Sequence, residues 1–196
     1  MAHHIYHTKG LILGSVAIGE SNRFYKIFTE ELGLIGASAQ SVREGKSKLR
    51  YALQDYSWIM LDVVRGREVW RITSAIPDTS RTSLSGDLNK QKVFARIASL
   101  MLRLVHGEVR QDDLFRDILH IQKFLERESL PVEFMNSFEV LSALRIFARL
   151  GYISEENYTE VIMGEEYSLE ILALFQRDFE KRAINDINKA LRESHL

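Results

Sequence analysis

Residues 33–50 of the chain are GLIGASAQSVREGKSKLR, an apolar run that leads directly into a basic loop. The loop, residues 41–50, contains a single acid, Glu44, and a second apolar run, YSWIMLDVV, follows at residues 56–64. The four cations of the loop are Arg43, Lys46, Lys48 and Arg50. A basic loop between two strands of a small β domain can neutralise the phosphates of a nucleic acid. Charge alone fits a solvated hairpin loop equally well.

Turn-forming residues divide the chain around this loop into short strand candidates. Turn signals at residues 19–22, 32–33 and 65–67 separate runs that are rich in β-branched and aromatic side chains. We expect strands at residues 4–16, 23–29, 34–41, 55–64 and 68–75. Five short strands at this spacing predict a small barrel or sandwich. Together with the basic loop they favour the five-stranded oligonucleotide/oligosaccharide-binding (OB) barrel.

The second half of the chain has a helical pattern. Residues 77–86 are rich in Ser, Thr, Asp and Pro and indicate a linker. Beyond them, apolar residues recur every three or four positions, which predicts a helical bundle. One long last helix is expected to carry Leu172, Phe179, Ala183, Ile187 and Leu191 on one face. The predicted fold class is therefore α+β, with an OB-fold barrel at 1–79 followed by an all-α helical domain at 80–196.

Composition restricts the classes of function. The 196 residues are 45% hydrophobic, which predicts a packed core, and the formal net charge is −1. There is no cysteine, which excludes disulfides, iron–sulfur clusters, thiolate zinc sites and cysteine nucleophiles. No apolar run approaches the roughly 20 residues that span a bilayer. We expect a soluble, cytoplasmic protein that does not contact a membrane.

No motif in the sequence specifies an enzyme. The chain has no Gly-x-Ser-x-Gly elbow, no Walker A motif and no dinucleotide glycine fingerprint. His3, His4 and His7 gather at the N-terminus, but an exposed terminus is a better interpretation than a metal site. We expect no catalytic residue, no metal and no cofactor.

Aromatic residues alternate with cations at three places, Arg23-Phe24-Tyr25-Lys26, Arg50-Tyr51 and Trp70-Arg71. Aromatic side chains that stack on bases beside cations are typical of single-strand binding. Phe24, Phe28 and Trp58 are predicted to lie in the core, whereas for Tyr51 and Trp70 both roles stay open. Further candidate DNA contacts, on the neighbouring strands and turns, are Arg23, Lys26, Arg65, Arg67 and Arg71.

Residues 10–57 resemble the N-terminal domain of the bacterial DNA repair protein family RecO. The resemblance is carried by Gly19-Glu20-Ser21-Asn22-Arg23, by the sequence FTEELG at 28–33, by the basic loop and by LQDY at 53–56. Thr73-Ser74-Ala75 and, in the second half, Leu150-Gly151-Tyr152 also match. Departures are Asn22 for the usual Asp, Gln40-Ser41-Val42 for Lys-Gly-Ala, Ser142-Ala143 for Phe-Glu, and the absence of the zinc-binding cysteines that many members carry.

The resemblance implies a recombination mediator. Members of the family bind single- and double-stranded DNA, anneal complementary strands, contact the C-terminal tail of single-strand-binding protein, and act with RecR to help load RecA. They need no cofactor. The alternatives from other classes are an RNA-binding module on the same barrel and a protein–protein adaptor.

The resemblance also implies a partner site in the helical half. The partner tail ends in an apolar residue with a free carboxylate, so its site needs an apolar pocket with cations near the mouth. The apolar candidates are Leu144, Phe147, Leu172 and Phe179, and the cationic candidates are Arg145, Arg149, Arg177, Lys181 and Arg182. The alternative is that the apolar residues form only the bundle core.

Overall fold

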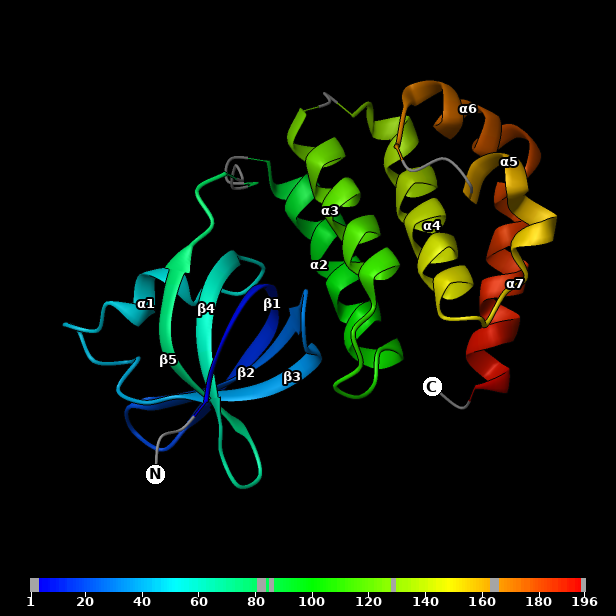
Figure 1. The fold of residues 1–196 in the computed structure, drawn as a ribbon. Helices are drawn as coiled ribbons and strands as arrows, with labels where there is room; N and C mark the ends of the chain where they lie inside the picture. Colours follow the sequence, from blue (N-terminus) through cyan, green and yellow to red (C-terminus); the bar gives the residue numbers. More distant parts are fainter. Residues whose placement is uncertain (1–3, 81–83, 85–86, 128–129, 163–165, 195–196) are drawn as a thin grey trace. The chain divides into compact units, whose positions relative to one another are not determined.

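The computed structural model describes residues 4–80, 84, 87–127, 130–162 and 166–194 (Figure 1). The chain forms two compact units. The first contains Met1–Ser83 together with Val105–Asp112, and the second contains Leu84–Leu104 together with Asp113–Leu196. Residues 105–112, which the sequence placed in the helical domain, therefore belong to the unit that contains the strands.

The first unit is a closed barrel of five strands in the order β1-β2-β3-β5-β4 (Figure 1). Its strands are β1 (Ile5–Ile18), β2 (Asn22–Thr29), β3 (Gly33–Ala39), β4 (Trp58–Arg65) and β5 (Trp70–Pro77). Neighbouring strands run antiparallel except β3 and β5, which pair in parallel at Ala37–Trp70 and Ser38–Arg71. The predicted fold class, an OB-fold barrel followed by helices, is confirmed.

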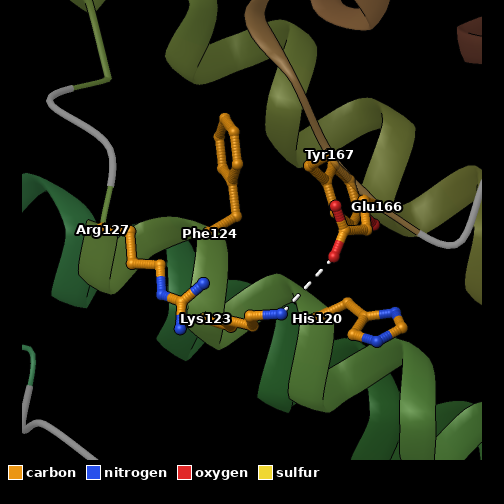
Figure 2. A pocket seen from close by; sticks show the side chains of 6 residues that line it. All are labelled: His120, Lys123, Phe124, Arg127, Glu166 and Tyr167. Carbon is orange, nitrogen blue, oxygen red and sulfur yellow. Dashed lines mark hydrogen bonds and ion pairs between the residues drawn. The ribbon is translucent and has the colours of Figure 1, made fainter.

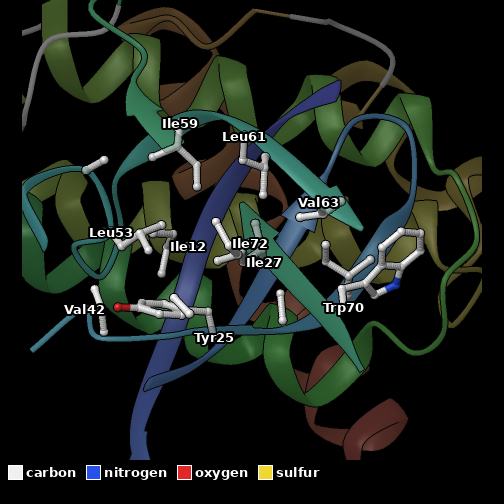
Figure 3. Packing of buried hydrophobic residues seen from close by; sticks show 14 residues of the cluster. Ile12, Tyr25, Ile27, Val42, Leu53, Ile59, Leu61, Val63, Trp70 and Ile72 are labelled. Atoms are coloured by element: carbon white, nitrogen blue, oxygen red, sulfur yellow. The ribbon is translucent and has the colours of Figure 1, made fainter. Parts of the chain in front are cut away.

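Every second side chain along the strands points into the barrel and forms its core. Successive side chains of a strand point to opposite faces, so Tyr25 and Ile27 of β2 enter the core while Phe24 and Lys26 point outward. Trp70 begins β5 and is only 5% exposed, which places it in the core (Figure 3). Other core residues labelled in Figure 3 are Ile12, Val42, Leu53, Ile59, Leu61, Val63 and Ile72.

Two strands are shorter than the sequence predicted near the basic loop. β3 ends at Ala39, because Ser41 has a left-handed backbone with φ 51°. β4 begins at Trp58, because Tyr56 is also left-handed, with φ 66°. Between them lies a short helix, α1 (Leu49–Ala52), which includes the last two residues of the predicted loop.

The segment Val105–Asp112 packs against the start of β3. Gly33 has φ +66°, and a Cβ added to it would lie 2.3 Å from the carbonyl oxygen of Val109. The Leu34 amide donates to the carbonyl of Gly107 at 3.3 Å. Ion pairs join Arg110 to Glu31 at 3.2 Å and Arg65 to Glu108. This segment therefore packs against the barrel through backbone contacts and ion pairs.

The second unit consists of helices. They are α2 (Leu88–Leu104), α3 (Asp112–Arg127), α4 (Val132–Arg149), the 3-10 helix η1 (Glu155–Tyr158), α5 (Thr159–Ile162), α6 (Leu169–Asp178) and α7 (Glu180–Glu193). The prediction of one long last helix is wrong, because Phe179 leaves helical geometry with φ −125° and divides α6 from α7. The Phe179 ring lies 6.1 Å from that of Tyr158.

None of the described helices has the length and apolar character that a membrane crossing requires.

Candidate nucleic-acid interface

The basic loop lies open at one end of the barrel. Arg43, Lys46, Lys48 and Arg50 are all exposed. Within the described part of the chain, Lys46, Lys48 and Arg50 form no ion pair, so their charges remain available for a ligand. Four cations against the single acid Glu44 within eight residues produce a local positive field even though the chain as a whole is near neutral.

The loop is fixed at its first half by the β1–β2 turn. The Val42 side chain is buried in the core, and the Arg43 amide donates to the Ser21 carbonyl at 3.0 Å. The Arg43 guanidinium donates to the Gly19 carbonyl at 3.0 Å, and the Ser41 amide donates to Asn22 Oδ1 at 3.0 Å. The Asn22 side chain therefore holds the first residue of the loop. Arg43 positions the turn as well as carrying charge.

The other candidate cations divide into two groups. Lys26 on β2, Arg71 on β5 and Arg67 in the β4–β5 turn are exposed. Arg23 is partly buried, and its Nε lacks a hydrogen-bond partner in the described residues. Burial raises the pKa of the nearby Tyr25 hydroxyl, and the Arg23 charge offsets part of that rise. Arg65 pairs with Glu108 and lies 4.8 Å from the Trp70 ring. The charges of Arg23 and Arg65 are therefore less available than those of the first group.

The aromatic residues do not all lie where the sequence placed them. Phe28 and Trp58 are buried as predicted, and Trp70 joins the core. Tyr51 in α1 is 77% exposed and stands beside Arg50. Phe24, predicted to be core, is partly exposed on the outer side of β2, because its neighbour Tyr25 takes the inward position.

The residues predicted to form the partner pocket form the helical core instead. Leu144, Phe147 and Leu172 are fully buried. Arg145 is 2% exposed and donates from Nη2 to the Val161 carbonyl at 2.8 Å. The prediction that these residues are accessible to a peptide is wrong, since apolar residues at helical spacing describe a core and a groove equally well.

The remaining cations predicted for that pocket are dispersed. Arg149 donates to Asp117 at 2.8 Å and to Glu155 at 3.2 Å. Arg177 pairs with the adjacent Asp178 at 2.6 Å. Lys181 is exposed at the start of α7. The structure thus does not bring the predicted apolar and cationic residues together at one accessible site.

A pocket that the sequence did not predict lies between α3 and the chain before α6 (Figure 2). Its volume is about 110 Å³. Lys123 Nζ lies 3.4 Å from Glu166 Oε1, and the rings of Phe124 and Tyr167 are 5.7 Å apart. The lining residues are His120, Lys123, Phe124, Arg127, Glu166 and Tyr167. The pocket combines two aromatic rings with the cations Lys123 and Arg127, and Glu166 neutralises part of that charge through its pair with Lys123. Among the described residues, no cluster of His, Asp or Glu could hold a metal ion.

A closed barrel of this topology, with an exposed basic loop and a helical unit after it, defines an OB-fold protein with an attached helical domain. Comparison with known proteins gives the particular family. Residues 1–80 match the family described as "Recombination protein O N terminal". The barrel half of the chain is therefore similar to the N-terminal domain of the RecO family, and the resemblance predicted from the sequence is confirmed.

Several relatives support this assignment. The chain is 31% identical over 126 residues to the DNA repair protein RecO of Gloeothece citriformis, and this match covers 64% of this chain and 44% of that protein. It is 36% identical over 111 residues to the RecO of Trichodesmium erythraeum, covering 57% and 38%. It is 26% identical over 149 residues to the RecO of Clostridium novyi, covering 76% and 57%. The matches thus span about half the length of these relatives.

Proposed function

We propose that the chain is a DNA repair and recombination mediator that binds single- and double-stranded DNA, anneals complementary strands and, with RecR, helps load RecA. The observation that carries the proposal is the exposed basic loop, fixed by the β1–β2 turn on a closed OB barrel. The relatives named DNA repair protein RecO support the biological context. In this proposal the protein acts in the cytoplasm, cleaves nothing and uses no cofactor.

The proposed binding depends on charge. Each cation that neutralises a phosphate releases a counterion, so affinity falls as salt rises. The turn holds the first half of the loop in place, so less conformational entropy is lost when DNA binds. Annealing follows from the same chemistry, because cations that screen phosphates reduce the repulsion between two complementary strands.

We also propose that the pocket of Figure 2 binds the C-terminal tail of single-strand-binding protein. Phe124 and Tyr167 line the pocket with apolar rings, and a ligand carboxylate would pair with Arg127 and would compete with Glu166 for Lys123. A tail peptide that ends in Phe should bind with micromolar affinity, which corresponds to about −8 kcal/mol. Removing that Phe, or replacing Lys123 and Arg127 with Ala, should abolish binding. Equal binding of full-length and truncated peptides would reduce the contact to charge attraction alone.

The DNA proposal is tested by the salt dependence of oligonucleotide binding. Replacing Lys46, Lys48 and Arg50 with Ala should weaken binding and reduce the slope of log affinity against log salt by about 0.7 for each lost single-strand contact. Arg43 is retained in this variant because it holds the β1–β2 turn. The matched control replaces three exposed cations of the helical unit, Arg103, Lys189 and Arg192, and so changes the net charge equally.

The outcomes separate the proposal from its alternatives. Loss in the loop variant but not in the control supports DNA binding by the loop, and a strand-annealing assay on the same variants tests the proposed activity. An unchanged slope in the loop variant would place the DNA on another surface. Tighter binding to RNA of the same sequence would favour an RNA-binding module. Absence of binding to either nucleic acid would favour a protein–protein adaptor.

A further inference from the structure

The outer surface of β2, β3 and β5 carries a distinct set of side chains. Phe24 pairs with Ser38 across β2 and β3, and Ser38 pairs with Arg71 across β3 and β5. Lys26 pairs with Gly36. Because the intervening residues of these strands belong to the core, the side chains of Phe24, Lys26, Ser38 and Arg71 point away from it. We call this surface the Phe24 face; Lys26 and Arg71 on it are exposed, and the other three residues are partly exposed.

The Phe24 ring lies down on the sheet instead of entering a core. A Cβ added to Gly36 would come within 2.5 Å of the ring atom Cζ, so the ring occupies the space that a side chain at position 36 would need. Lys26 Nζ lies 5.7 Å from the ring centroid, within the range of a cation–π contact. The outer surface of the barrel therefore carries a partly exposed aromatic ring with a cation over it.

The Phe24 face is continuous with the basic loop. Phe24 follows Asn22 by two residues on β2, and Asn22 Oδ1 accepts the Ser41 amide at the start of the loop. Ser38 is the second-last residue of β3, which leads into the same loop. A strand bound to the loop cations would thus reach the Phe24 ring over a surface of small side chains. Lys26 lies two residues further along β2, and Arg71 lies on β5 beyond Ser38.

We propose that the Phe24 face is a base-stacking site for single-stranded nucleic acid, with Lys26 and Arg71 contacting the flanking phosphates. An aromatic ring on a surface that also carries cations binds unpaired bases, whose π faces are open, whereas a duplex keeps its bases stacked on one another. The inference rests on the proposed function and deepens it, because it gives the barrel a preference for unpaired over paired strands.

The test compares Phe24→Ala with the unsubstituted full chain, by fluorescence anisotropy on three probes. These are an oligothymidylate, a duplex of the same length and an abasic strand that keeps the phosphates but lacks bases. The substitution should weaken oligothymidylate binding about tenfold, which corresponds to about 1.4 kcal/mol. It should change duplex and abasic binding less than twofold. The salt slope should stay the same, because no cation is removed.

Further variants separate stacking from folding and from charge. Phe24→Trp keeps a stacking surface and should bind oligothymidylate as the original does. Phe24→Leu keeps apolar volume without a ring, and it decides the outcome if circular dichroism finds Phe24→Ala unfolded. Lys26→Ala and Arg71→Ala should each lower the salt slope on all three probes.

The result that overturns the inference differs from the one that overturns the proposed function. If Phe24→Leu and Phe24→Ala bind oligothymidylate like the original while the Lys46/Lys48/Arg50 variant loses affinity, the stacking site is refuted and the nucleic-acid function stands. Equal loss on the abasic and base-containing strands also refutes stacking. If the unsubstituted chain binds none of the three probes, the proposed function itself is wrong.

Discussion

Gly33→Ala should destabilise the barrel through two separable effects. Gly33 has φ +66°, and the left-handed conformation costs a residue with a Cβ about 1–2 kcal/mol. The new Cβ would also lie 2.3 Å from the Val109 carbonyl oxygen, so residues 105–112 must move. That movement breaks the hydrogen bond from the Leu34 amide to Gly107, worth about 0.5–1.5 kcal/mol. Together these effects predict a loss of about 1.5–3.5 kcal/mol in the free energy of unfolding.

The matched control is Gly19→Ala. Gly19 has φ +59°, but no atom lies within 4 Å of an added Cβ, so this variant carries only the backbone cost of about 1–2 kcal/mol. The assay is urea unfolding followed by tryptophan fluorescence, because both tryptophans, Trp58 and Trp70, belong to the barrel unit. Equal destabilisation by the two substitutions would refute the idea that the Val109 contact stabilises the barrel.

Three further predictions concern the helical unit and metal. Leu144→Ala should lower the free energy of unfolding by about 2–5 kcal/mol, because Leu144 is fully buried. Leu169→Ala, at a position 38% exposed, should lower it much less, and equal urea midpoints for the two variants would argue against a core role for Leu144. Tyr158→Phe should cost about 1 kcal/mol, since it removes the 2.7 Å bond to Asp186, while Tyr152→Phe serves as a control at a partly exposed ring. Because the chain has no cysteine, a chelator should leave the melting temperature unchanged, and a drop of several degrees would contradict this.

The barrel could be predicted from sequence because its strands alternate with a period of two. β2 shows both the strength and the error of that reasoning. Lys26 shares a face with Phe24, and a lysine is rarely buried without a partner. The sequence therefore contained the signal that Phe24 points outward, although Phe24 was predicted to be core.

Other features could not be derived from pattern. The left-handed turns at Ser41 and Tyr56 occur at residues other than glycine, so nothing in the composition marks where β3 ends and β4 begins. The return of residues 105–112 to the barrel depends on contacts with Gly33 that are distant in sequence. Arg145 is predicted to lie at a pocket mouth because a partner's free carboxylate would need a cation there, yet its guanidinium donates to the Val161 carbonyl and lies 4.2 Å from the Tyr167 ring.

The parallel contact between β3 and β5 has a consequence for the motions of the barrel. It joins the two strands through only two residue pairs, whereas β2 and β3 are joined through seven. Local opening begins where the fewest backbone bonds must break, so the amide protons of β3 and β5 that face each other should exchange with solvent water sooner than those between β2 and β3. Ser38 and Arg71 lie at this contact, so a strand bound across them would hold the two edges together and slow that exchange.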